Sequence, residues 1–279
     1  MDCIVCSGIG IVLRKEGLRI DFHTHGKLAK KLPFSVPYTD WLFGEAKRAG
    51  LDAICLTEHF NTLQFEDLYR YLSNHCERDK DSFLSKNGLR IFAGMETDIA
   101  EGGHILSLGA PESILELNRR LEPNKTPDTF LSFDRLMDLF EEYGVLVGAA
   151  HPYRVGGHIP ELFGEQLGRV HFLDLNGKDM AEHAERTKRL TLELGRKINK
   201  PVVAGSDTHQ AVQYGCIYTT FEQEMKTIHE LYVQMSQGNY EINIAEQAAF
   251  QVRTAGILKR ALKEIHALGG DYVDVLICD

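Results

Sequence analysis

The chain has 279 residues, of which 43% are hydrophobic and 25% are charged, and its formal net charge is −9. This composition is typical of a globular protein and excludes a largely disordered chain. The acidic balance argues against a protein that coats nucleic acid or anionic membrane, and no apolar run approaches the ~18 residues that span a bilayer. We therefore expect a cytoplasmic protein without a membrane partner, for which nucleic acid is an unlikely partner.

Residues 1–17 precede the first convincing strand pattern, and we interpret them as an N-terminal appendage. Cys3 and Cys6 form a C-x-x-C pattern there, but no second cysteine pair supports a zinc or redox site. The segment has no basic region before its apolar stretch and no clear cleavage site, so it only faintly resembles a signal peptide. We predict no function for this cysteine pair.

From residue 18 onward, short apolar runs rich in Val and Ile alternate with longer stretches of helical periodicity. The predicted strands are 18–23, 51–57, 89–98, 104–109, 145–150, 170–176 and 201–206, followed by a possible strand at 215–221 and a short one at 240–245. The predicted helices are 39–50, 65–79, 132–144, 179–198, about 222–237 and about 247–268.

This alternation is typical of βα units with right-handed crossovers and a mainly parallel sheet. About seven units in a chain of this length favour a closed barrel over an open sheet. No glycine-rich nucleotide-binding motif opens a predicted helix, and no linker divides the chain. We predict a single α/β domain, a TIM-like barrel over residues 18–279 with a C-terminal helical extension.

Residue types that bind metals occur at the ends of five predicted strands, and a sixth predicted strand begins with one. They are His23, His25, Glu58, His59, Glu96, His151, Asp207 and His209 at the ends, and His104 at the beginning. In a parallel barrel the carboxyl ends of all strands share one rim, which carries the active site. Residues two apart in a strand point to the same face, so each paired ligand can reach one ion. Imidazoles and carboxylates without cysteine suit Zn, Mn or Fe and argue against a closed structural zinc site.

Six short motifs follow one another between Leu18 and His209, over about two thirds of the chain: DFHTHG, LTEH, GMETDI, GGHILSLG, AHPYR and GSDTH. With these motifs in this order the chain resembles the PHP (polymerase and histidinol phosphatase) family. The resemblance implies a distorted (β/α)7 TIM-like barrel, two or three divalent metal ions, and cleavage of phosphate esters.

The metal ligands that the resemblance implies are divided among three ions. The first ion would be held by His23, His25, Glu96 and Asp207. Glu96 would bridge to a second ion that is also bound by His104 and His151. A third ion would be bound by His59 and His209.

The sequence departs from the family at the third ion. Family members place an Asp or His five or six residues after the H-x-H pair, whereas Lys30 and Lys31 occupy those positions here. The third ion is then absent, weakly held, or bound with the help of another residue. Alternatively, a lysine replaces the positive charge of this ion and pairs with substrate phosphate. Glu58 stands where the family has Asp, and we expect it to support a metal ligand rather than to be one.

The expected mechanism is attack by a metal-bound hydroxide, because two cations bridged by Glu96 would lower the pKa of a shared water. Asp207 and His209 are the predicted catalytic residues, which orient the nucleophile or protonate the leaving group. Four basic side chains are predicted to bind the substrate phosphate: Arg154, Lys178, Lys27 and Lys31. The predicted function is hydrolysis of a small phosphate ester, in the manner of a histidinol phosphatase.

Two other functions remain open from the sequence. An amidohydrolase-like barrel that cleaves amides or lactones also begins with H-x-H, but it commonly uses a carboxylated lysine at the bridging position that Glu96 holds here. A degenerate, non-catalytic PHP module would have lost ligands, and only the third site departs from the family. Nuclease action is possible for the family, yet the acidic balance makes us expect a small phosphorylated substrate.

Overall fold

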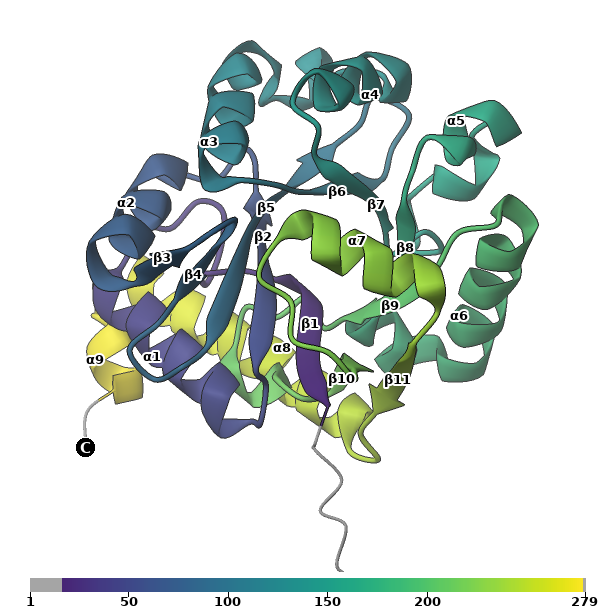
Figure 1. Ribbon diagram of the computed structural model, residues 1–279. Helices are drawn as coiled ribbons and strands as arrows, with labels where there is room; N and C mark the ends of the chain where they lie inside the picture. Colours follow the sequence, from purple (N-terminus) through teal and green to yellow (C-terminus); the bar gives the residue numbers. More distant parts are fainter. Residues whose placement is uncertain (1–16, 278–279) are drawn as a thin grey trace, which may run out of the picture.

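The computed structural model describes residues 17–277, so the predicted N-terminal appendage, with its cysteine pair, lies outside the described residues apart from Gly17. Within that range, a nearly closed barrel is formed by β1 (Leu18–Thr24), β2 (Ala53–His59), β5 (Arg90–Asp98), β6 (His104–Leu108), β7 (Leu146–Ala150), β8 (Phe172–Asn176) and β9 (Val202–Gly205) (Figure 1). The chain after β9 returns to β1, where Asp207 N donates to His23 O at 2.7 Å and Thr24 pairs with Thr208. The predicted single-domain α/β barrel is confirmed.

One barrel strand runs against the others. β6 pairs antiparallel with both β5 and β7, whereas β1, β2 and β5, like β7, β8 and β9, pair in parallel. Only residues 99–103 connect β5 to β6, and a parallel connection needs a dozen residues or more. Because β6 is reversed, its first residue, His104, lies at the end of the barrel where the parallel strands finish.

Three further pairings extend the sheet. β10 (Ile217–Phe221) pairs antiparallel with β1, and β11 (Tyr240–Ile244) pairs antiparallel with β10. A hairpin that the sequence did not predict, β3 (Glu77–Asp79) and β4 (Ser82–Leu84), pairs with β5. The helix predicted for 65–79 therefore stops early, because Cys76 is extended at φ −117° and ψ 152° and leads into β3.

Helices surround the barrel (Figure 1). They are α1 (Val36–Arg48), α2 (Phe65–His75), α3 (Pro111–Arg120), α4 (Phe133–Glu142), α5 (Gly164–Gly168), α6 (Gly177–Ile198), α7 (Ile228–Gln237), α8 (Ala248–Ala267) and α9 (Tyr272–Ile277). Short 3-10 turns occur at Glu122–Asn124, Pro127–Thr129, Ile159–Glu161 and Ala211–Gln213. None of the helices in residues 17–277 combines the length and apolarity that crossing a membrane requires.

Two apolar cores leave only one end of the barrel for polar chemistry. Alternate strand residues face opposite sides, so Phe92 of β5 packs inside the barrel while Ile91 and Ala93 pack against the outer helices. The interior core continues into Leu231 and Met235 of α7. Since β10 ends beside the start of β1 before the chain enters α7, this helix covers the amino end of the barrel. The carboxyl end remains for the site.

The interior packing is tight around Gly148 of β7. A Cβ placed there would lie 2.2 Å from the Phe172 ring. We expect Gly148→Ala to lower the free energy of unfolding by roughly 1–3 kcal/mol, the usual cost of overpacking a core, in urea denaturation. Gly164→Ala is the control, because a Cβ there meets nothing within 4 Å. Equal stability of the two variants would contradict the close contact.

Candidate metal centre

The predicted metal-ligand side chains come together at the carboxyl end of the barrel. Seven of them are buried and His104 is partly exposed. The full set is His23, His25, His59, Glu96, His104, His151, Asp207 and His209. Each lies within 4 Å of another member through side-chain nitrogen or oxygen atoms or through ring stacking.

Glu96 occupies the centre of this group. Its Oε1 lies 2.6 Å from His104 Nδ1 and 3.0 Å from His151 Nε2. Its Oε2 lies 2.7 Å from His59 Nδ1 and 3.5 Å from His23 Nε2. A carboxylate whose two oxygens face different imidazoles is placed to bridge two cations, which is the role that we propose for Glu96.

Several buried atoms in the cluster have no hydrogen-bond partner within the described residues. They are His23 Nε2 and both ring nitrogens of His25, and also His59 Nδ1 and Glu96 Oε2, which lie 2.7 Å apart but do not form a hydrogen bond. Unpaired buried polar atoms cost free energy, and cations bound among them would remove that cost. Three sets of ligand atoms lie within 4.8 Å of one another: His23, His25 and Asp207; His23, Glu96 and His151; His25, His59 and His209. The donors therefore fit divalent ions, and the sets overlap the three predicted sites.

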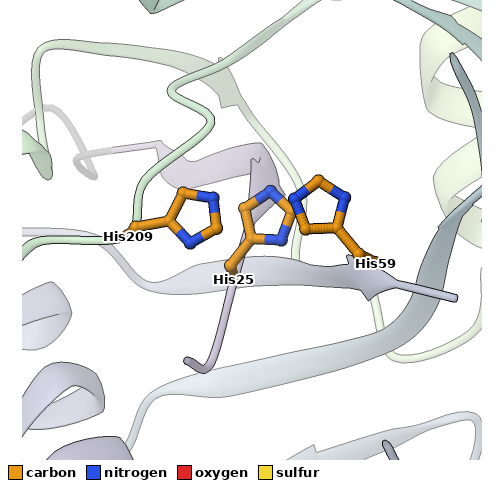
Figure 2. A group of neighbouring side chains, drawn as sticks. All are labelled: His25, His59 and His209. Carbon is orange, nitrogen blue, oxygen red and sulfur yellow. The ribbon is translucent and has the colours of Figure 1, made fainter. Parts of the chain in front are cut away.

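Three imidazoles are stacked in the third set. Figure 2 shows His25 between His59 and His209, with ring centroids 4.3 and 4.0 Å apart. Burial lowers the pKa of His59 to about 4 even though Glu96 opposes the shift. Burial and the neighbouring His25 also lower the pKa of His209 far below its usual value. Neutral imidazole is the form that binds metals, so this stack is prepared to act as a ligand group.

Neighbouring carboxylates raise the pKa of two other histidines. Burial alone would lower the pKa of His104, but Glu96 and Asp98 outweigh it and raise that pKa to about 9. Burial of His23 is likewise outweighed by Glu96 and Asp174, which raise its pKa well above the usual value. A bound cation replaces such protons, so metal loading is expected to release protons.

Asp174 of β8 contacts a candidate metal ligand, and the sequence analysis missed it. It is fully buried, and its Oδ2 accepts hydrogen bonds from His23 Nδ1 at 2.8 Å and from Asn176 Nδ2 at 3.0 Å. Because Nδ1 of His23 donates to Asp174, Nε2, which lies 3.5 Å from Glu96 Oε2, is the nitrogen that can bind a cation once its own proton is released. The only signal in the sequence was an acidic residue inside the apolar run 170–176.

Two other carboxylates support the ligands. Asp98 Oδ1 lies 3.1 Å from His104 Nε2. Glu58 Oε1 lies 3.5 Å from His25 Nδ1, and the Glu58 carboxylate accepts the backbone N–H groups of Gly26 and His59. These contacts agree with the supporting role that we proposed for Glu58.

The backbone at the strand ends is strained where ligands leave the barrel. His151 and Asp207 have φ values of +29° and +59°, which side-chain-bearing residues rarely adopt. Gly205 has no space for a side chain, since a Cβ there would lie 2.3 Å from His23 Cβ. The glycine in the GSDTH motif therefore allows β9 to approach β1 and bring Asp207 close to His25.

Two predicted substrate-binding residues lie beside the cluster. Arg154 Nη1 donates to Asp207 Oδ2 at 2.8 Å, and Arg154 Nε donates to Asp179 Oδ1 at 3.0 Å. Lys178 Nζ lies 2.7 Å from Asp207 Oδ1. Both cations are partly exposed and ion-paired with carboxylates at the edge of the cluster.

The other two predicted substrate-binding lysines are placed differently. Lys27 is buried and its ammonium donates to Thr62 Oγ1 and to the Leu63 carbonyl, so it is not directed at the cluster and the expectation for it is corrected. Lys31 is exposed and makes no hydrogen bond or ion pair with any described residue. Lys30, at a position where the family has a ligand, lies 3.5 Å from Asp98 Oδ2.

Imidazoles and carboxylates gathered at the carboxyl end of a β/α barrel are the arrangement of a metal-dependent hydrolase. A family model with the description PHP-associated matches residues 186–239. This match confirms the resemblance to the PHP family that the six motifs indicated, and it supports the prediction of a metal-dependent hydrolase. Among curated proteins, none matches the chain.

Solved structures share the fold. PsfC from Pseudomonas syringae PB-5123 has a TM-score of 0.74 and 22% identity, over 88% of this chain and 99% of that protein. The lesion-specific endonuclease PfuEndoQ from Pyrococcus furiosus has a TM-score of 0.60 and 18% identity, over 81% of this chain and 57% of the endonuclease. Endonuclease Q in complex with a 27-mer duplex that has an abasic lesion at its active site has a TM-score of 0.59 and 17% identity, over 81% of this chain and 58% of that one. At these identities the similarity establishes the fold.

The expectation that nucleic acid is an unlikely partner is wrong. The fold is shared with an endonuclease whose substrate complex contains duplex DNA. A net charge of −9 does not exclude such a substrate, because a phosphate responds to the local field of a site rather than to the summed charge of the chain. Here the edge of the cluster carries Arg154 and Lys178 together with the carboxylates of Asp207 and Asp179, which the summed charge of the chain does not describe.

Removing the central carboxylate tests the metal centre. We expect Glu96→Gln to weaken metal binding by more than about 100-fold, which exceeds the loss of affinity usual when a residue that only supports a ligand is replaced. We expect His25→Ala to remove bound metal as well. Metal content after dialysis would be measured by elemental analysis, with circular dichroism to verify folding. Glu112→Gln, at an exposed position paired with Arg78, is the control. Wild-type metal content in the Glu96 and His25 variants would refute the ligand assignment.

Asp174 gives a graded test of ligand orientation. Asp174→Asn removes the carboxylate that holds His23, so we expect metal affinity to fall by about 10–100-fold without loss of the fold. Competition with a chelator of known affinity measures the change. Asp52→Asn, at the opposite end of the barrel, is the matched control. An unchanged affinity for Asp174→Asn would show that Asp174 does not position His23.

Proposed function

We propose that this protein is a metal-dependent phosphoesterase that binds the phosphoryl group of its substrate between the ligand cluster and the side chains of Arg154 and Lys178. The observation that carries the proposal is the pairing of Asp207 with both cations at the edge of a cluster built for divalent ions. Bound divalent ions would supply an activated water and positive charge for the phosphoryl oxygens. Arg154 and Lys178 add hydrogen-bond donors that can stabilise a phosphoryl group.

A backbone carbonyl sets the tautomer of His209. His209 Nδ1 lies 2.9 Å from the backbone carbonyl of Lys27, which can only accept, so Nδ1 carries the proton. His209 Nε2 then offers its lone pair on the side of Asp207, 3.9 Å away. We propose that Asp207 and His209 orient the nucleophile and handle the proton of the leaving group, in addition to any contact with metal.

The substrate class that we propose is a small phosphate ester. The cluster is buried, and the pocket that opens beside His209 has a volume of about 400 Å³, within the range typical of small-ligand sites. Cleavage of DNA is the second candidate, because endonuclease Q shares the fold and has been captured with duplex DNA. An amide or lactone hydrolase is less favoured, since the residue at the centre of the ligand groups is a glutamate, Glu96.

Hydrolysis of 4-nitrophenyl phosphate by the Mn-loaded protein tests the proposal. We expect the rate with Mn to exceed that of the chelator-treated protein by about 100-fold or more, since the ions supply the nucleophile and charge stabilisation. The Glu96→Gln variant is the inactive control. Activity on 4-nitrophenyl acetate or 4-nitroacetanilide alone would replace the phosphoesterase with an ester or amide hydrolase. Cleavage of an abasic duplex without phosphatase activity would replace the small substrate with DNA.

A further inference from the structure

A pocket lies next to the cluster on the side of α6 and α8. Its volume is about 400 Å³, enough for a small organic ligand. His209 belongs both to the ligand cluster and to the wall of this pocket, so a molecule in the pocket is adjacent to any group held at the cluster. The residues of the wall that carry the argument are His209, Lys178, Glu182, Arg253, Gly256 and Lys259.

Lys259 of α8 is the unusual residue in this wall. It is partly buried, and within residues 17–277 no hydrogen bond or ion pair holds its ammonium group. Burial, with the nearby charge of Lys178, lowers its pKa to about 7. An ammonium group removed from water without a partner costs free energy. A bound anion would provide the missing partner.

The shape of α8 leaves space for such an anion. Ala255 and Gly256 lie four and three positions before Lys259, so both lie on the face of the helix that carries Lys259. A Cβ at Gly256 would meet nothing within 4 Å, so the space in front of this face is open. Arg253 and Arg260 also line the pocket, against the single carboxylate of Glu182, so its charge favours an anionic ligand.

We propose that this pocket is the subsite for a second anionic group of the substrate, and that Lys259 is the specificity-determining residue that recognises it. The proposal rests on the proposed phosphoesterase function, because the scissile phosphate would lie at the cluster and the remainder of the substrate would extend past His209. The substrate class is then a phosphate monoester that carries a further carboxylate or phosphate. Helix α8 would thereby complete a pocket whose other wall residues lie between Lys178 and Gln213.

A matched pair of substrates tests this subsite. Phenyl phosphate and its 3- and 4-carboxyphenyl counterparts share the scissile bond and differ in the second anion. For the Mn-loaded protein we expect Lys259→Ala to lower kcat/KM on a carboxyphenyl phosphate by about tenfold or more, the effect of one lost charge-assisted hydrogen bond. The same variant should change kcat/KM on phenyl phosphate by less than about threefold. Lys259→Arg should retain the preference for the second anion.

The matched control is Lys263→Ala. Lys263 lies one turn further along α8 and is exposed, and it does not line the pocket. This variant should behave as the wild type on both substrates. Equal losses on both substrates for Lys259→Ala, or no loss on either, would overturn the proposal, because a specificity residue must change the ratio of the two rates.

A binding measurement separates this proposal from the proposed function. Phenylphosphonate and carboxyphenylphosphonate have no hydrolysable ester, and calorimetry measures their affinities without turnover. We expect the wild type to bind a carboxyphenylphosphonate about tenfold more tightly than phenylphosphonate, and Lys259→Ala to lose that preference. This preference without any hydrolysis would retain the subsite and reject the phosphoesterase. Hydrolysis without any preference would reject the subsite and retain the phosphoesterase.

Discussion

Glu96 is a buried carboxylate that faces ring nitrogens of five histidines, and the rest of the site is arranged around it. The distances range from 2.6 Å to His104 up to 3.6 Å to His25. So many titratable groups removed from water destabilise a protein unless charge is balanced among them. Some imidazoles are held neutral by burial and others are drawn toward the charged form by carboxylates. Divalent ions would bind to the neutral imidazoles and would replace the protons of the charged ones.

The barrel supplies the rigidity that this arrangement needs. The apolar interior and α7 occupy the amino end, and the carboxyl end carries the ligands. Two local features adapt the barrel to the site. The reversed strand β6 brings His104 to the rim, and the absence of a side chain at Gly205 lets the chain after β9 pair with β1. Asp174 then fixes the ring of His23 from within β8.

Charge has to be considered locally in this molecule. The chain is acidic as a whole, yet Arg154 and Lys178 lie beside Asp207, where we propose that a phosphate binds, and Lys259 lines the adjoining pocket. The overall charge therefore does not exclude a nucleic-acid substrate, and the fold is shared with an endonuclease. The site geometry indicates a class of chemistry, and in our proposal α8 contributes to the choice of substrate.

The sequence alone predicted the barrel strands and the convergence of their ligands, because strand periodicity is local and parallel strands must end at a common rim. It did not predict the reversal of β6: a mainly parallel sheet was expected, and the sequence showed only that His104 begins its strand. Asp174 and Lys259 were not predicted, because their roles depend on what lies across the barrel or on a distant helix. Lys27 was misjudged for the same reason: only the folded chain shows that its ammonium group turns to the loop at Thr62 and Leu63. Local patterns set the strands and their ends, whereas contacts between residues far apart in the chain decided which polar groups face the site.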